Sequence, residues 1–405
     1  MTERIDDNAF AAKCRLFLDA NAERLDAASA TLEDSDAIPV FDSPERSEEE
    51  AQLAVARDWQ RALFDAGLAW IDGPTDYGGA GLAHHHQEVF DEMCAQYRLP
   101  KLNTLFVTFH IVLPGLLAAA SDDLKRRLVP ALLRGDLIAC QLFSEPGAGS
   151  DLSAVSTRAV RAEGGAVWVA TGQKVWTSGG HYSDIGLLLA RTSDDDVPHR
   201  RLTMFVVDMH DPAIEVRPLR EMSGGAHFNE VFIDGLHIQD SCRVGDVNGG
   251  WRVAMATLGG ERKAVGYSSD APNWVVVQRL LELARTAAHR GQIAASVVDA
   301  VVRCYVLGSA IEHTAANLAA AERRGDTRGP EMSTLKLLRN RLLRDCIDTA
   351  GHILGMNMLA DSGERGTYAW GYASTLAPGL RIGGGTDEIQ KNIIGERLLG
   401  LPRDR

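Results

Sequence analysis

The chain has 405 residues, enough for two or three domains or one large composite fold, and its hydrophobic (45%) and charged (24%) fractions are ordinary for a globular protein. The formal net charge of −13 argues against nucleic acid or an anionic membrane as a partner, because both bind through clustered Lys and Arg. It leaves room for one phosphorylated ligand held by a local site.

Nothing in the sequence predicts secretion or membrane insertion. The N-terminal stretch MTERIDDNAF lacks the basic region and apolar run of a signal peptide. The longest charge-free stretch, 102–121, contains His110 and Pro114 and hardly reaches the length of a membrane span, so it favours buried helices. Six scattered cysteines without a CxxC pair are typical of reduced thiols, so a cytoplasmic location is expected.

Hydrophobic periodicity divides the chain into three regions. Residues 1–137 carry apolar side chains three and four positions apart and predict an N-terminal helical domain. Residues 138–245 hold short β-branched and aromatic runs separated by Gly, Asp and Pro, which predict a central β domain. Long helical patterns return in 246–405. The expected class is therefore α+β, and the lack of strand–helix alternation argues against a Rossmann sheet.

Several catalytic signatures are missing, namely GxSxG, HExxH and GxxxxGK[ST]. His84, His85 and His86 form a triple, which we interpret as the polar start of a helix. A metal site would require further ligands, so none is predicted.

Two motifs accompany the predicted strands. In QLFSEPGAGSDLS, the residues Gly147, Gly149 and Ser150 could present backbone N–H groups and hydroxyls to an anion, or could simply form a turn. In KVWTSGG, the side chain of Trp176 could pack in a sheet or form a platform for a flat ring, with hydroxyl donors from Thr177 and Ser178 at the ring edge.

Two further motifs lie in the C-terminal region. In WRVAMATLGGERKAV, the helical spacing puts Glu261 on an apolar stripe, where a carboxylate is costly unless paired. It could be a general base with a raised pKa, or could lie at the stripe edge and pair with Arg262 or Lys263. In RIGGGTDEIQ, glycines precede a helix that Thr386 or Asp387 could cap, with Asp387 and Gln390 spaced as a capping box.

The segments SEPGAGSD, GQKVWTSGG, FNEVFIDGLHI and RIGGGTDEIQKNIIGERLLGLP, in this order, resemble the acyl-CoA dehydrogenase family of flavoproteins, in the style of its actinobacterial branch. The resemblance covers nearly the whole chain. It implies a β-barrel-like or β-sandwich middle domain, a C-terminal four-helix bundle, and FAD bound between the two. It also implies dehydrogenation of an acyl-CoA thioester, in which a carboxylate takes the α proton and a hydride passes to flavin N5.

The resemblance also implies roles for individual residues. The cofactor positions are Ser144, Trp176, Thr177, Ser178, His352, Gly355, Thr386, Glu388 and, for the pyrophosphate, either Arg285 or Arg290. Ser150 resembles a serine near the flavin and CoA phosphates. The sequence departs from the family at Met356, where a second glycine is usual, and at His352, where many members have glutamine.

The catalytic carboxylate is the main departure. Many members carry it at the position of Gly384, whereas one subset carries it in a Glu-Arg pair that corresponds here to Glu261 and Arg262. We therefore expect Glu261 to be the base, Arg262 to lie on the CoA side, and the backbone N–H of Gly384 to remain a donor to the thioester oxygen. The pair Gly259-Gly260 could admit a branched or ring-bearing acyl chain, or serve helix packing.

Three functions remain open on this resemblance. The first is a working acyl-CoA dehydrogenase, either a homotetramer or part of a heterotetramer with a related chain, which passes electrons to an electron-transfer flavoprotein. The second is a flavin-dependent oxygenase or oxidase on the same fold. The third is a non-catalytic partner subunit.

Overall fold

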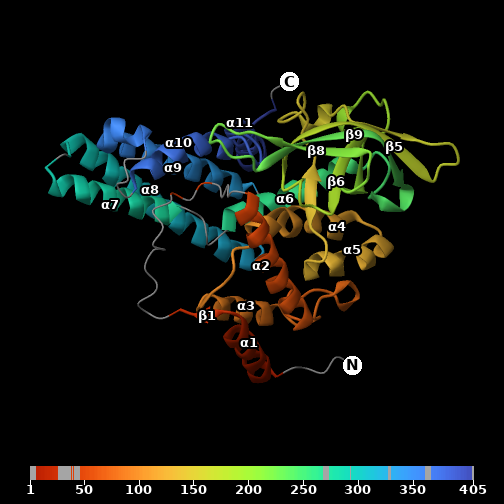
Figure 1. Cartoon of the computed structure of the whole chain (residues 1–405), viewed down its shortest axis with the longest axis horizontal. Helices are drawn as coiled ribbons and strands as arrows, with labels where there is room; N and C mark the ends of the chain where they lie inside the picture. Colours follow the sequence, from red (N-terminus) through yellow and green to blue (C-terminus); the bar gives the residue numbers. More distant parts are fainter. Residues whose placement is uncertain are drawn as a thin grey trace. The chain divides into compact units, whose positions relative to one another are not determined.

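The computed structural model describes residues 6–25, 38, 40, 46–267, 273–291, 293–326, 330–360 and 366–403, without the side chains of 260–267, 273, 322 and 323. The chain forms two compact units (Figure 1). The first comprises Met1–Thr31, Ser43–Glu221 and Gly225–Thr257, and the second comprises Leu32–Asp42, Met222–Gly224 and Leu258–Arg405. The division into 1–137, 138–245 and 246–405 stays a prediction.

The first unit begins with helices that pack on one another through apolar stripes. They are α1 (Asp7–Asn21), α2 (Arg46–Asp65), α3 (His84–Cys94), α4 (Leu113–Ala119) and α5 (Asp122–Arg134). Short helical turns lie at Thr75–Tyr77, Asn103–Leu105 and Thr108–Val112, and β1 (Glu23–Arg24) pairs with β2 (Tyr97–Arg98). Phe10, Cys14 and Leu18 recur every fourth residue on α1 and are buried in one cluster with Trp59 and Phe90.

The same unit contains an eight-stranded sheet. Its strands are β3 (Ala139–Leu142), β4 (Arg158–Arg161), β5 (Val167–Ser178), β6 (Ile185–Arg191), β7 (Leu202–Asp208), β8 (Ile214–Leu219), β9 (Phe228–Gln239) and β10 (Arg243–Val244). The order is β10-β7-β6-β4-β5-β9-β8, and β3 pairs in parallel with β6. Short turns lie at Leu152–Ala154, Pro198–Arg200 and Asp240–Cys242.

Strand β6 is buried along nearly its whole length, because strands pair with it on both sides. Residues 185–190 are all buried, which explains their unbroken apolar run IGLLLA. Helix α4 approaches closely enough that a Cβ at Gly115 would lie 3.6 Å from Leu187 and 2.4 Å from Thr257. Glycine at 115 therefore permits the close packing of α4 on the sheet.

The second unit is helical. Helix α6 (Gly250–Tyr267) starts in the first unit and ends in the second, and is followed by α7 (Asn273–His289), α8 (Ala295–Arg323), α9 (Glu331–Leu354), α10 (Thr367–Leu380) and α11 (Asp387–Ile393), with short turns at Gly355–Leu359 and Ile394–Leu398. Helices α7–α10 form a bundle around one core that includes Leu280, Ile311, Leu342 and Trp370 (Figure 1). Its interior is apolar along several helical turns.

The predicted α+β class is confirmed, with an N-terminal helical region, a central β region and a C-terminal helical bundle. None of the helices in the described part of the chain is both long and apolar enough to cross a membrane.

Candidate functional site

The two strand-associated motifs meet in the first unit through a buried ion pair. The loop 144–151 follows β3, and Lys174 lies within β5. The ammonium of Lys174 donates to Glu145 Oε1 (2.8 Å) and to the carbonyl of Phe143 (3.0 Å). The side chains of Lys174 and Glu145 are 0% and 3% exposed. The pair thus fixes the start of the SEPGAGSD loop on the strand that continues into KVWTSGG.

The carboxylate of Glu145 is fully engaged. Besides Lys174, it accepts hydrogen bonds from the backbone N–H groups of Ser156 and Thr157 (2.6 and 2.9 Å) and from the Ser156 hydroxyl (2.6 Å). Burial alone would raise the pKa of Glu145, but the charge of Lys174 and these hydrogen bonds lower it to about 2. Burial lowers the pKa of Lys174 to about 8, against the attraction of Glu145. Both groups are therefore charged at pH 7.

A β-bulge presents Trp176. Lys174 pairs with Val231 and Thr177 pairs with Asn229, so β5 carries one extra residue between these two pairs. Trp176 has a φ of +62°, a left-handed conformation that is strained for a side chain of this size. Its indole is 57% exposed and contacts only the edge of Phe228 among described rings, with centroids 5.8 Å apart. The bulge therefore holds a large aromatic face outward.

Thr177 and Ser178 follow Trp176 directly along the backbone. The carbonyl of Ser144 accepts the N–H of Val175 (2.9 Å), which joins the loop to the bulge. The hydroxyl of Thr177 is buried and has no hydrogen-bond partner among the described residues. Ser144 and Ser178 are half-buried. Thr177 is buried on the face of β5 opposite the exposed indole of Trp176, so its hydroxyl does not border the indole.

A chain of hydrogen-bonded side chains that starts at the carbonyl of Thr177 was not predicted from the sequence. Asn229 donates to the carbonyl of Thr177 (3.0 Å) and lies 3.2 Å from His181 Nδ1, while His181 Nε2 lies 2.6 Å from Glu49 Oε2. With the Asn229 amide as donor, Nδ1 accepts and Nε2 donates to the carboxylate, so the network selects one histidine tautomer. Glu49 lies 128 positions before Thr177, and no local pattern could have predicted the contact.

The glycine run of the second unit is held by side chains from α9. Lys336 donates to the carbonyls of Gly383 and Gly385. Gly384 and Gly385 have φ values of +66° and +91°, which glycine adopts without strain. Among the described residues, no acceptor is present for the backbone N–H of Gly384. The run thus directs its carbonyls at Lys336 and leaves this N–H available.

Helix α11 starts as predicted in part. Thr386 caps it, and its hydroxyl accepts the N–H of Ile389 (3.2 Å). The expected capping box of Asp387 and Gln390 is wrong. Asp387 accepts instead from Arg381 and Asn340 (both 2.8 Å), because these donors lie beside its buried carboxylate.

The side chain of Gln390 turns back to the carbonyls of Gly384 and Gly385 (2.9 and 3.2 Å). It is fully buried. Gln390 is therefore a further residue that holds the glycine run, together with Lys336.

The remaining predicted residues are spread along the chain. Ser150 is exposed in the first unit, and Arg285, Arg290 and Glu388 are exposed in the second. His352 lies in the last turn of α9, with Nδ1 2.7 Å from the carbonyl of Asp348. Gly355 ends this helix with a φ of +55°. Glu261 and Arg262 occupy helical positions in α6, and their side chains lie outside the described residues.

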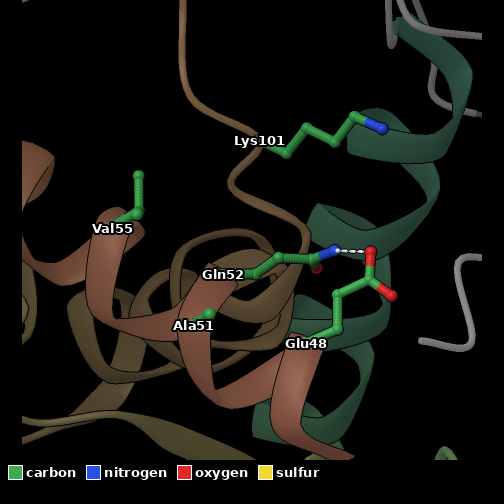
Figure 2. A pocket seen from close by; sticks show the side chains of 5 residues that line it. All are labelled: Glu48, Ala51, Gln52, Val55 and Lys101. Carbon is green, nitrogen blue, oxygen red and sulfur yellow. Dashed lines mark hydrogen bonds between the residues drawn. The ribbon is translucent and has the colours of Figure 1, made fainter. Parts of the chain in front are cut away.

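The hollow shown in Figure 2 lies elsewhere in the first unit. It measures about 290 Å³ and is lined by Glu48, Ala51, Gln52, Val55 and Lys101. Gln52 donates to Glu48 across one turn of α2 (3.4 Å), while Lys101 extends from the chain opposite (Figure 2). It contains none of the predicted site residues, and we assign it no function.

Comparison with known proteins agrees with the motifs. Family models for the N-terminal, middle and C-terminal domains of acyl-CoA dehydrogenases match residues 38–136, 140–236 and 248–399. The acyl-CoA dehydrogenase IpdE1 of Mycobacterium tuberculosis is 35% identical over 350 residues, which cover 86% of this chain and 88% of IpdE1. FadE34 of the same organism is 35% identical over 364 residues, which cover 89% of this chain. The chain spans about half (48%) of the length of FadE34.

Solved structures with the same fold include the ChsE4–ChsE5 complex of Mycobacterium tuberculosis, with a TM-score of 0.72 and 24% identity over the full length of both chains. The Tcur3481–Tcur3483 steroid ACAD also has a TM-score of 0.72, with 21% identity over the full length of both chains. At these identities the likeness shows the fold.

Proposed function

This chain belongs to the acyl-CoA dehydrogenase family, and from that premise we propose that it uses FAD to remove hydrogens from Cα and Cβ of an acyl-CoA thioester. The observation that carries the proposal is the joining of SEPGAGSD to KVWTSGG by Glu145 and Lys174, because it brings two motifs of the family resemblance to one place. The outward indole of Trp176 offers a wall for a flat ring system.

The described residues fit a flavin. Ser144, Trp176, Thr177 and Ser178 would hold it in the first unit, and the exposed indole of Trp176 supports this assignment. From the second unit the family assigns His352, Gly355, Thr386, Glu388 and either Arg285 or Arg290 to the cofactor. The chemistry that FAD supplies when bound is acceptance of the hydride from Cβ.

The protein's own part in the reaction is the movement of the α proton. The carboxylate of Glu261 takes this proton as the Cα–H bond breaks, and the electron pair moves toward the thioester carbonyl. The backbone N–H of Gly384 donates to the thioester oxygen, where negative charge develops. The lack of an acceptor for this N–H among the described residues supports this role. Ser150 and Arg262 bind the CoA moiety.

The acyl group we propose is branched or ring-bearing. A Cβ built at Gly259 would meet no described atom within 4 Å, which supports open space two positions before Glu261. An electron-transfer flavoprotein is the proposed acceptor. We propose a tetramer, made of identical chains or of two related chains.

The test is the variant Glu261→Gln, with Glu163→Gln as a matched control at an exposed turn. Turnover of a panel of linear, branched and ring-bearing acyl-CoA esters is measured with an artificial acceptor, and bound flavin is measured by absorbance. We expect Glu261→Gln to keep the flavin and lose about 10²- to 10⁴-fold in kcat, as is typical for removal of a general base. Full activity of this variant would refute the assignment of the base.

The competing functions give other results. An oxygenase would consume oxygen and a reduced flavin and insert oxygen into its substrate, with little dependence on Glu261. A non-catalytic partner subunit would bind no flavin and show no turnover until a second, related chain is co-expressed. Flavin bound by the chain alone, with turnover, excludes that role.

A further inference from the structure

A cluster outside the proposed active site joins the first turns of α1 and α3. His85 Nε2 and His86 Nε2 lie 3.0 and 3.3 Å from the same oxygen, Asp7 Oδ1. One atom from each of these three residues lies within 4.8 Å of the other two. Among the described residues, Asp7, His85 and His86 are the set of His, Cys, Asp and Glu side chains close enough together to share a metal ion. Asp7 is far from the histidine triple in sequence, so the cluster exists only in the fold.

His86 supplies an independent sign that a ligand belongs here. Its side chain is only 8% exposed, yet Nε2 has no hydrogen-bond partner. Nδ1 lies 3.2 Å from the carbonyl of Ala83, which can only accept, so Nδ1 carries a proton. In the neutral ring Nε2 therefore presents a lone pair toward the carboxylate of Asp7. At 3.3 Å from the carboxylate oxygen, this nitrogen is balanced either by its own proton or by a metal ion bound to both atoms.

The distances suit a zinc ion. Zinc binds imidazole nitrogen and carboxylate oxygen at about 2.0–2.2 Å, so the ligand atoms of a tetrahedral site lie about 3.3–3.5 Å apart. The separation of His86 Nε2 from Asp7 Oδ1, 3.3 Å, falls in this range. The separation of His85 Nε2 from the same oxygen, 3.0 Å, is a hydrogen bond here and would lengthen slightly around a bound ion. His86 Nε2 and Asp7 Oδ1 lack the alignment of a hydrogen bond, as expected when both aim at a common point rather than at each other.

The surroundings of His86 resemble the support of a metal ligand. The hydrogen bond from Nδ1 to Ala83 fixes the tautomer that leaves Nε2 free for coordination. The ring of Phe10 packs edge-on against the imidazole, with centroids 4.8 Å apart, which fixes its orientation. His85 lies 3.9 Å from His86 between ring centroids.

We propose that Asp7, His85 and His86 bind one zinc-type divalent transition-metal ion, which ties the start of α1 to the start of α3. Two nitrogen ligands favour such an ion over Ca²⁺ or Mg²⁺, which prefer oxygen. Three protein ligands leave a fourth position for water, since Asp7 and His85 are 73% and 52% exposed. The positive ends of two helices oppose a cation, so the affinity is moderate. The site is independent of the proposed acyl-CoA chemistry.

The experiment is calorimetric titration of Zn²⁺ into the full chain, freed of affinity tag and bound metal. We expect one zinc per chain and a zinc-dependent rise in melting temperature. Asp7→Ala and His85→Ala change exposed side chains and keep the core, and each should weaken binding at least about tenfold, as loss of a ligand exceeds loss of a supporting hydrogen bond. His84→Ala is the control, because His84 bonds to Asp72 outside the cluster (2.6 Å).

Zinc binding in the parent and in His84→Ala, with loss in Asp7→Ala and His85→Ala, supports the site. Absence of saturable binding to the parent overturns it, and a proton on His86 then balances Asp7. Binding that survives unchanged in both exposed variants also overturns it, because the metal then lies elsewhere. Circular dichroism of each metal-free variant establishes that the fold is retained.

Discussion

The buried pair of Glu145 and Lys174 provides the sharpest test of how the loop 144–151 is held. The variant Lys174→Met removes the ammonium and keeps an unbranched apolar side chain. It leaves the carboxylate of Glu145 without a cation and the carbonyl of Phe143 without a donor. Removal of one partner of a buried ion pair costs about 3–5 kcal/mol. We expect the lower end, about 3 kcal/mol, because the donors at Ser156 and Thr157 remain.

A double-mutant cycle separates the pair from its surroundings. In Glu145→Gln the buried Lys174 can lose its proton, since burial already lowers its pKa to about 8. That variant should therefore cost less than Lys174→Met. In the double variant neither charge is left alone, so its loss should be smaller than the sum of the single losses by about 1–3 kcal/mol.

The assay is urea unfolding at pH 7, followed by far-UV circular dichroism, with bound flavin per chain measured in parallel. Arg46→Met is the matched control, because Arg46 forms an exposed pair with Glu50 on α2, and its loss should cost no more than about 0.5 kcal/mol. If Lys174→Met stays within about 1 kcal/mol of the parent and retains its full flavin content, the pair does not hold the loop, and the reasoning from burial is wrong.

Three further predictions test other parts of the site. The pKa of Glu145 is about 2 in the folded protein, below its usual value of 4.5, so the ionised carboxylate stabilises the fold above pH 4.5. About 3 kcal/mol of the free energy of unfolding should therefore be lost as the pH falls from 4.5 to 2. The same acid titration of Glu145→Gln should lack this loss. Trp176→Gly relieves a left-handed backbone but adds glycine entropy, so the flavin-free protein should change by less than about 1 kcal/mol while flavin titration shows weakened binding. Lys336→Met removes the donor to the carbonyls of Gly383 and Gly385 and should displace the N–H of Gly384. The value of kcat/KM should therefore fall by about 10²-fold while flavin is retained. Unchanged kinetics would show that Lys336 does not position the N–H that contacts the thioester.

Periodicity predicted the helical, β and helical order because each region buries one face at a regular spacing. It could also have indicated the ion pair. Trp168, Ala170 and Lys174 alternate along β5, and the first two are buried, so Lys174 falls on the buried face of the strand. A lysine there needs an anionic partner. What the sequence could not supply was the partner's identity, since Glu145 lies in a loop 29 positions earlier.

The contacts of Lys336 and Gln390 with the glycine run could not be predicted from local sequence patterns either, because they depend on the folded backbone. A Gln at the fourth position after Thr386 fits several roles on a helix. Which carbonyls it reaches depends on the left-handed turns at Gly384 and Gly385. Three consecutive glycines indicate that special dihedrals are allowed, but not which are adopted.

The exposure of Trp176 shows most clearly what alternation along a strand cannot predict. Strict alternation would place it on the same face as Trp168 and Lys174, within the packed sheet. The extra residue between Lys174 and Thr177 reverses the faces, so Thr177 is buried and Trp176 is exposed. A bulge of this kind has no sequence signal when the residue with positive φ is tryptophan rather than glycine. The strain at Trp176 therefore favours the platform over the packing interpretation, because a residue that served only packing would have no reason to retain it.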